Sequence, residues 1–376
     1  MNFEFSEDSA LLRDQARSFL RDKCDPKVVR RVLDGEAPFA SDLWQEMAAM
    51  GWLGAAIPEE YGGAGLGYEG LCVLAEEIGR SVAPVPFASS VYLAAEAILA
   101  AGSEAQKRAL LPKLADGSLI GTFALAEGFG QPVPGAIEAR VVGGALTGVK
   151  WPVPDASYAD FAIVVARGEG GIGLYHVDLT GKGVARTPLQ TVDPSRNQAR
   201  LDLTGAKAER LGDASGASGT GDAWPVVERV LERAAILVAF EQVGGAEACL
   251  HMARDYAMAR FAFGRPIASF QAIKHKLADV YVALELARSN AYYGAWALSD
   301  GGAELPLAAA AARVAATEAY YVASKENIQT HGGVGFTWEF DCHLYYRRAK
   351  HLALTLGAAP FWKNRLVDQL ETRNAA

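Results

Sequence analysis

The sequence is poor in cysteine and histidine, which excludes several classes of site. Four cysteines occur in 376 residues, and none forms a CxxC pair: Cys24, Cys72, Cys249 and Cys342. Thiols spaced this widely are typical of buried side chains in a reducing compartment and not of a disulfide framework. The six histidines show no HExxH or similar spacing, so we assign no metal site.

Long apolar runs and an excess of positive charge are also missing. No stretch of about eighteen apolar residues is present, so we expect no membrane span. The first eight residues are acidic and lack a signal-peptide pattern. The net charge is 36 − 44 = −8, without a large basic patch. We therefore expect a cytoplasmic protein that has neither a membrane nor a nucleic acid as its partner.

What is present is a large apolar fraction. Hydrophobic residues make up 51% of the chain and charged residues 21%, enough for a sizeable core in two or three domains. Residues 1–117 show helical periodicity and no alternating strand pattern. Ser6 is the predicted N-cap of a helix over residues 5–23, and further helices are expected near 42–50, 69–82, 88–101 and 104–115. The sequence thus predicts an all-helical first domain.

The pattern changes near residue 120. Short alternating segments follow one another, separated every eight to twelve residues by Gly, Pro or Asp, and they include GTFALAE, DFAIVVA and GIGLYHVDL. This is typical of a compact antiparallel β domain, which we place at residues 118–222. The Gly/Ser/Asp-rich residues 212–222 form its expected boundary.

The remaining residues, 223–376, are again helical. Runs over 223–260, 270–299, 306–330 and 359–372 have short connections, which predicts an antiparallel four-helix bundle. The first run is expected to break at Gly244 and Gly245. The fold class is therefore multidomain α+β, with a helical domain, an antiparallel β domain and a helical bundle in that order.

Residues 260–279 combine a helix break with positive charge. Their sequence is RFAFGRPIASFQAIKHKLAD, in which Gly264 and Pro266 interrupt two helices. An arginine near a helix end can bind a phosphate or pyrophosphate. On these residues alone, a helical hairpin with a solvated basic rim is the favoured explanation.

Three sequence motifs change that interpretation. The first is R-x-x-F-G-x-P-I-x-x-F-Q at residues 260–271, the second is QTHGGVGF at 329–336 with TWEFDCHLYYRRAK after it, and the third is PEEYGGAG at 58–65. Together, and in this order, they resemble the acyl-CoA dehydrogenase family of flavoproteins. The resemblance implies the three-domain architecture, FAD as cofactor and an acyl-CoA thioester as substrate.

The resemblance also implies which residues bind the cofactor. Arg260 matches the arginine at the FAD pyrophosphate, Phe263 lies in the same turn, and Gln271 falls in the next FAD-contacting stretch. A loop near the adenine end is matched by Gln329, Gly332 and Gly333. Glycines let backbone N–H groups approach a cofactor closely, and arginine offers charge-assisted hydrogen bonds to phosphate. The alternative for the glycine pair is a simple helix stop.

The family reaction needs a carboxylate base near the carbon alpha to the thioester. At the position where most relatives carry this glutamate, the chain has Leu356, followed by Gly357. At the second family position, on the long helix before the turn, it has Ala234. Glu241, two helical turns further along, is a weak candidate because a locally paired or solvated glutamate explains it as well. The catalytic residues therefore stay unassigned.

The loops expected beside the flavin ring also depart from the family pattern. A T-E-P-G-x-G-S-like motif is replaced by residues 126–129, AEGF. A tryptophan-isoleucine-threonine motif is replaced by residues 152–154, PVP, with Trp151 one place early. Hydrogen-bonding groups are lost at both places, since proline has no backbone N–H.

Three hypotheses follow. The chain resembles the branch of the family that acts on steroid side chains and other bulky acyl-CoAs, in which unequal subunits pair and one lacks the base. The first hypothesis is therefore an FAD-dependent acyl-CoA dehydrogenase subunit in a homo- or hetero-oligomer, with an electron-transfer flavoprotein as electron acceptor. The second hypothesis is an autonomous enzyme with a relocated base such as Glu241. The third is a non-catalytic acyl-CoA-binding or scaffold protein that has lost flavin.

Overall fold

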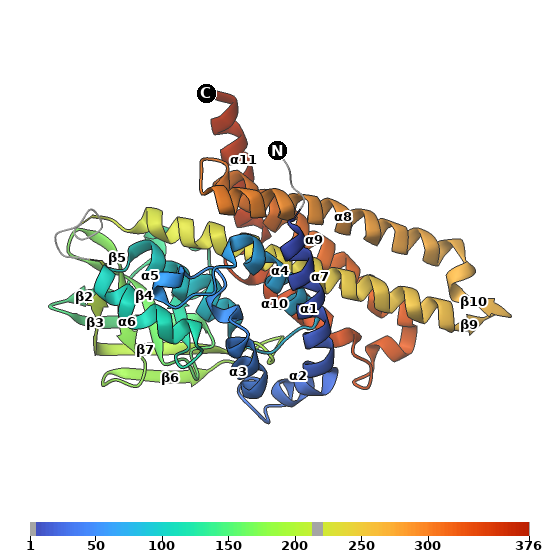
Figure 1. Ribbon diagram of the computed structural model, residues 1–376, viewed down its shortest axis with the longest axis horizontal. Helices are drawn as coiled ribbons and strands as arrows, with labels where there is room; N and C mark the ends of the chain where they lie inside the picture. Colours follow the sequence, from blue (N-terminus) through green and yellow to red (C-terminus); the bar gives the residue numbers. More distant parts are fainter. Residues whose placement is uncertain (1–4, 213–220, 376) are drawn as a thin grey trace. The chain divides into compact units, whose positions relative to one another are not determined.

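The computed structural model describes residues 5–212 and 221–375, and these residues fall into two compact units (Figure 1). Of the described residues, the helical unit comprises 5–29, 68–83 and 235–375. The mixed unit comprises 30–67, 84–212 and 221–234. The predicted helical segments are thus divided between the two units. All the strands from residue 121 to 210 belong to the mixed unit.

Long helices dominate the helical unit. Its α-helices are α1 (Glu7–Lys23), α4 (Gly67–Arg80), most of α7 (Trp224–Ala259), α8 (Gln271–Asp300), α9 (Leu305–His331), α10 (Cys342–Leu354) and α11 (Ala359–Ala375). Helix α8 packs along α9, and α10 and α11 pack on α9 as well (Figure 1). The predicted N-cap of α1 is confirmed, since Ser6 Oγ accepts a hydrogen bond from the Ser9 backbone N–H at 3.2 Å. Helix α10 was not predicted.

Helix α7 is continuous through Gly244 and Gly245, so the predicted break is wrong. A Cβ atom on Gly244 would lie 1.9 Å from the carbonyl oxygen of Glu76 on α4, and one on Gly79 of α4 would lie 2.0 Å from that of Glu241. Glycine costs about 1 kcal/mol inside a helix. Here it permits the backbones of α4 and α7 to touch, which no residue with a side chain would allow.

A buried ionic cluster joins four helices of the helical unit. Glu247 of α7 pairs with Arg80 of α4 and, at 3.0 Å, with Arg288 of α8. Arg17 of α1 binds Glu77 of α4 at 2.7 Å. Burial favours the protonated form of Glu247, but the two arginines outweigh it and lower its pKa to about 2. This cluster keeps α7 and α8 in register.

The mixed unit contains a twisted sheet and short helices. The sheet order is β6-β7-β3-β2-β4-β5-β8, and β1 pairs with β4. The strands are β1 (Gly121–Ala124), β2 (Arg140–Val142), β3 (Ala145–Pro154), β4 (Phe161–Gly168), β5 (Gly171–Asp178), β6 (Val184–Pro188), β7 (Gln198–Lys207) and β8 (Glu209–Arg210). Most neighbours are antiparallel, as predicted, but β1 and β2 both run parallel to β4. Strand β6 was not predicted.

The helices of the mixed unit are α3 (Ser41–Ala49), α5 (Glu96–Ala101) and α6 (Glu104–Ala115), together with the first turns of α7. Helix α2 (Pro26–Leu33), which was not predicted, lies where the sequence passes from one unit to the other. The predicted helix 88–101 is confirmed in outline, but its first part, Ala88–Ala95, is π-helical. A π-helical segment of this length is rare and is often found at functional sites.

All four cysteines are buried and free. In the part of the chain that the structure describes, no helix has the length and hydropathy needed to cross a bilayer. The predicted boundary loop 212–222 falls largely on residues 213–220, which lie outside the described residues.

Candidate functional site

The turn that contains Arg260 joins α7 to α8. It consists of a short hairpin, β9 (Phe261–Ala262) and β10 (Arg265–Pro266), and a 3-10 turn, η5 (Ile267–Ser269). The Arg260 backbone is held on both sides, because its N–H donates to Tyr256 O and its carbonyl accepts from Ile267 N–H, each at 2.8 Å. The predicted order of helix, tight turn and helix is confirmed.

The side chains predicted to contact FAD at this turn face solvent. Arg260 is exposed, and no carboxylate of a described residue lies within ion-pair distance of it. Phe263 is 94% exposed at the hairpin tip, with φ +54°, and meets the Phe270 ring edge-on at 6.2 Å. Gln271 is exposed in the first turn of α8. A guanidinium without an internal partner retains its donors for an external anion.

The second predicted motif forms the end of α9 and the 3-10 turn η6 (Gly332–Phe336). Gln329 is exposed on the last turn of α9. Gly332 caps the helix with φ +63°, a conformation that disfavours other residues. Gly333 is not in that conformation, and a Cβ atom at either glycine would meet no atom within 4 Å. The helix-stop explanation therefore accounts for Gly332 but not for Gly333.

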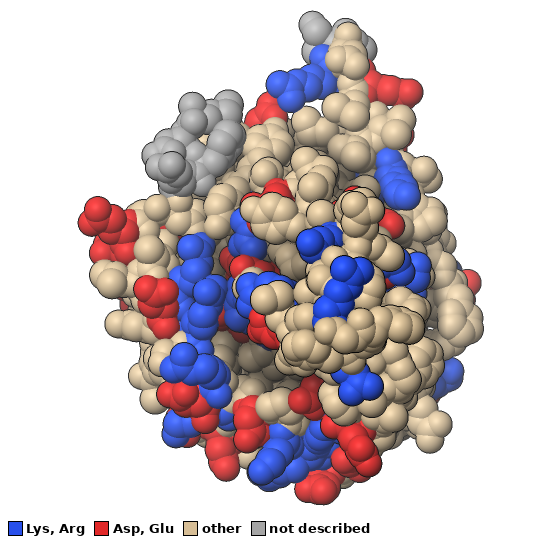
Figure 2. Space-filling view, turned by 90° about the vertical axis from the view of Figure 1, so that its right-hand side faces the viewer, with Lys and Arg blue, Asp and Glu red and all other residues tan. Residues whose placement is uncertain are grey.

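Both motifs lie at the same end of the helical unit. The ring of Tyr256, near the end of α7, stacks on His331 of α9 with centroids 4.1 Å apart. Lys276, near the start of α8, pairs with Glu326 near the end of α9 at 3.2 Å. Figure 2, which looks onto the end where β9 and β10 lie in Figure 1, shows positive and negative side chains interspersed among uncharged residues.

The position where relatives carry the base is a tight turn between α10 and α11. Leu356 has φ +63°, which costs a residue other than glycine about 1–2 kcal/mol. Its carbonyl oxygen accepts a hydrogen bond from Trp362 Nε1 at 3.2 Å. The leucine side chain is half-buried and cannot accept a proton.

Arg313 holds this turn, a role that sequence reasoning missed. The side chain, on α9, is 1% exposed. Nη2 donates to the carbonyl oxygens of Leu352 and, at 2.8 Å, Thr355, and Nη1 donates to Gln242 Oε1 at 2.5 Å and Thr317 Oγ1 at 2.7 Å. None of these acceptors is a carboxylate, and burial lowers the pKa of Arg313 to about 9. In the sequence, this role is indicated by a single charged residue inside the alanine tract AAAAARVAA.

The other two candidate positions for a base are buried. Ala234 on α7 is 0% exposed and belongs to the mixed unit. Glu241 is also 0% exposed, and its carbonyl oxygen lies on the side of α7 that touches Gly79 of α4. A solvated Glu241 is therefore excluded, while a locally paired one remains.

In the mixed unit, the two divergent loops lie beside each other. The backbone N–H of Gly128 donates to Trp151 O, and that of Trp151 donates to Ala126 O, each at 2.9 Å. Phe129 is 96% exposed and meets the Trp151 ring edge-on at 4.9 Å. Aromatic surface thus occupies the place where the family pattern has small hydrogen-bonding groups.

The carboxylate in these loops is already used. Glu127 accepts hydrogen bonds from Lys150 Nζ at 2.6 Å and from the backbone N–H groups of Glu138, at 2.7 Å, and Ala139. Burial lowers the pKa of Lys150 to about 8, although Glu127 opposes the shift. Glu127 therefore fixes the loop and is not free to take a proton from a substrate.

Comparison with known proteins decides the family. The family model described as the acyl-CoA dehydrogenase N-terminal domain matches residues 6–118, and that of the C-terminal domain matches residues 221–368. This chain belongs to the acyl-CoA dehydrogenase family. The family uses FAD, which agrees with the cofactor predicted from the sequence. Helical, β and helical segments in this order also match acyl-CoA dehydrogenase structures.

Three relatives are especially similar to this acyl-CoA dehydrogenase. The acyl-CoA dehydrogenase IpdE2 of Mycobacterium tuberculosis is 34% identical over 345 residues, 91% of each chain. A structure of a variant of the Tcur3481–Tcur3483 steroid ACAD is 34% identical, with a TM-score of 0.88 over 98% of this chain and 99% of the other. The ChsE4–ChsE5 complex from M. tuberculosis is 29% identical, with a TM-score of 0.89 over 99% of each chain. These neighbours support the steroid-degrading branch.

The geometry fits the nucleotide half of FAD. Arg260 has no internal ion pair among the described residues, and the space around Gly332 and Gly333 is open to an incoming group. The reactive half is different, because neither family position for the base carries an acid. The residues predicted to bind the nucleotide are therefore accessible to it, whereas neither position predicted for the base carries a group that accepts a proton.

Proposed function

We propose that the chain is an FAD-dependent acyl-CoA dehydrogenase subunit that takes part in α,β-desaturation of an acyl-CoA thioester without supplying the base. The observation that carries this proposal is Leu356, an apolar residue in a well-fixed turn at the family's carboxylate position. The carbonyl oxygens of Thr355 and Leu356 accept hydrogen bonds from Arg313 and Trp362, so the turn is held in place although it carries no acid.

The nucleotide end would bind FAD as follows. Arg260 donates hydrogen bonds to the pyrophosphate, and Gly332 and Gly333 let the cofactor approach the backbone. Phe263, Gln271 and Gln329 supply contact area and hydrogen bonds from the same end of the helical unit. Bound FAD supplies the hydride acceptor, and an electron-transfer flavoprotein reoxidises it.

A partner subunit would supply the base, and two similar structures support a paired enzyme. One names Tcur3481–Tcur3483, a steroid ACAD, and the other names the ChsE4–ChsE5 complex. By this likeness the substrate is a bulky acyl-CoA, such as a steroid-derived one. The partner is then a second acyl-CoA dehydrogenase chain with an intact glutamate.

The exposed aromatic side chains of the helical unit favour an oligomer. Phe261, Phe263 and Phe336 are 61%, 94% and 86% exposed, and Trp338 is 50% exposed. Such apolar area is normally covered by a partner. We expect a dimer or tetramer burying more than roughly 1,600 Å² of total surface. Sedimentation velocity at micromolar concentration checks this, and a monomer, alone and with the partner, would contradict it.

The deciding experiment is acyl-CoA-dependent bleaching of flavin by the purified chain, alone and then co-expressed with a second acyl-CoA dehydrogenase chain from the same genome that retains the glutamate. General base catalysis typically contributes about 10²–10⁴-fold, so the chain alone should be nearly inactive and the pair active. Strong bleaching by the chain alone, abolished in Glu241→Gln, would show that the base has moved. Absence of flavin absorption, alone and with the partner, would favour a non-catalytic scaffold.

A further inference from the structure

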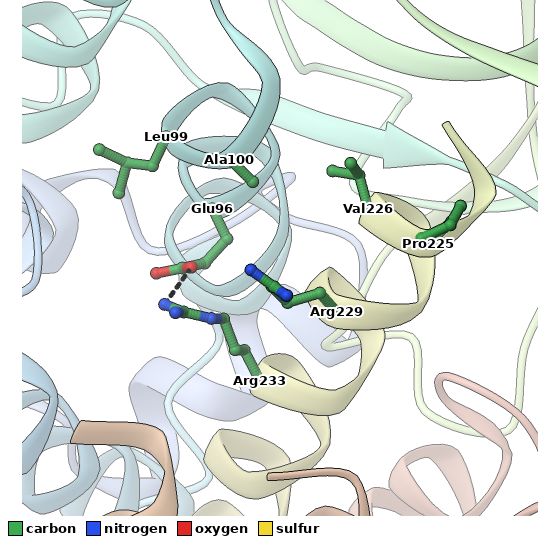
Figure 3. A pocket seen from close by; sticks show the side chains of 7 residues that line it. All are labelled: Glu96, Leu99, Ala100, Pro225, Val226, Arg229 and Arg233. Atoms are coloured by element: carbon green, nitrogen blue, oxygen red, sulfur yellow. Dashed lines mark hydrogen bonds and ion pairs between the residues drawn. The ribbon is translucent and has the colours of Figure 1, made fainter. Parts of the chain in front are cut away.

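A small cavity in the mixed unit has no part in the proposed reaction. Its volume is about 290 Å³, and it lies between α5 and the first three turns of α7 (Figure 3). Helix α5 continues directly from the π-helical segment Ala88–Ala95. The lining residues are Glu96, Leu99, Ala100, Pro225, Val226, Arg229 and Arg233.

The cavity has a charged end and an apolar end. Arg229 and Arg233 are one helical turn apart on α7, and Figure 3 shows both guanidinium groups directed toward α5. The remaining four lining residues are aliphatic and come from both helices. A ligand that matches both ends has an apolar body and one polar terminus.

The charge at the polar end is positive. Glu96, whose side chain is 3% exposed, pairs with Arg233 at 3.3 Å and offsets that charge. Arg229 is exposed, and no described carboxylate lies within 4 Å of its guanidinium. Like charges at i and i+4 destabilise a helix unless an anion compensates them. The wall is therefore left with one positive charge that a bound anion would neutralise.

We propose that this cavity binds a small carboxylate with an aliphatic body, held by the Arg229 guanidinium. A carboxylate matches the arginine fork, and the alkyl chain covers Leu99 and Val226. The volume accommodates about ten non-hydrogen atoms at ~30 Å³ each. Inorganic phosphate would satisfy Arg229 but leave the aliphatic wall in water, so it is the weaker ligand.

Hexanoate is the probe, titrated calorimetrically into the full-length protein at low ionic strength, where screening is weak. Binding is expected in the millimolar range normal for so small a ligand. Hexanol, which has the same chain without the charge, and inorganic phosphate should each bind at least about tenfold more weakly.

Two substitutions test whether hexanoate binds in this cavity. Arg229→Gln is at the surface and should weaken hexanoate binding about tenfold, by loss of the charge-assisted hydrogen bonds. Leu99→Trp should fill the cavity and abolish binding. Arg254→Gln, at an exposed arginine on the same helix but outside the cavity, should leave it unchanged.

The proposal is wrong if hexanoate does not bind, if hexanol or phosphate binds equally well, or if Arg229→Gln retains the wild-type affinity. Hexanoate binding that survives both Arg229→Gln and Leu99→Trp would come from another site and would also overturn it. None of these outcomes depends on flavin or on acyl-CoA turnover, so the test is independent of the proposed function.

Discussion

Two regions of α9 carry opposite kinds of structure. At the C-terminal end of the helix, Gln329, Gly332 and Gly333 are exposed. About 24 Å back along the helix at 1.5 Å per residue, Arg313 is buried and donates hydrogen bonds to the carbonyl oxygens of Leu352 and Thr355. The first region presents its residues to solvent, whereas the second uses its charged side chain inside the chain.

The difference separates two requirements of the family. Cofactor-binding residues must stay free of internal partners, since their donors are needed by a ligand from outside. A turn that positions a catalytic residue must instead be fixed, and it can remain fixed after that residue has changed. Leu356 is therefore compatible with an intact fold and an intact nucleotide end, which is what a base-lacking subunit requires.

The largest expected effect is the loss of stability when Arg313 is replaced. Arg313→Met should destabilise the protein by about 4 kcal/mol, because several buried acceptors lose their donor at roughly 1–3 kcal/mol each. Urea unfolding measures the change. Arg313→Lys retains the charge with fewer donors and should cost about half as much. A loss below about 1 kcal/mol in Arg313→Met would show that the turn does not depend on this arginine.

A smaller effect is expected when Arg260 is replaced, and it concerns the binding of FAD and not the stability of the fold. Arg260→Ala should weaken FAD retention by roughly 1.5–3 kcal/mol, the range for a hydrogen bond to a charged group. Flavin content after extensive dialysis gives the result. Arg254→Ala, an exposed arginine on α7 that pairs with Asp255, is the matched control and should retain flavin. Equal flavin content in the two variants would refute the pyrophosphate assignment.

The smallest effect distinguishes a helix stop from a cofactor contact. Gly332→Ala should cost about 1 kcal/mol in stability because alanine is strained at φ +63°. Gly333→Ala should leave urea unfolding unchanged, since its Cβ atom would enter open space. If Gly333 contacts FAD, the same substitution should nevertheless lower flavin retention. Unchanged stability together with unchanged flavin retention would leave Gly333 without a role in binding.

The sequence alone determined the order of helical, β and helical segments, because hydrophobic periodicity is a local property. It also gave both motifs predicted to bind the cofactor and the leucine at position 356, because these depend on residue identity. The alternation of apolar residues gave most strands, whereas β6 lacks buried apolar positions and gave no such signal. Helix α10 does have an amphipathic pattern, with Leu344, Arg348 and Leu352 on its buried side, and was missed although the pattern is present.

Only the tertiary structure decided what depends on contacts between distant residues. The pair Gly244 and Gly245 was predicted to break the helix, yet Gly244 is where α4 touches α7, and Gly245 makes room for the Tyr320 ring of α9. Arg313 read as part of a helical alanine tract, yet it supports the turn of Leu356 about forty residues further along. Neither role has a local pattern, since each follows from which backbone atoms packing brings within reach.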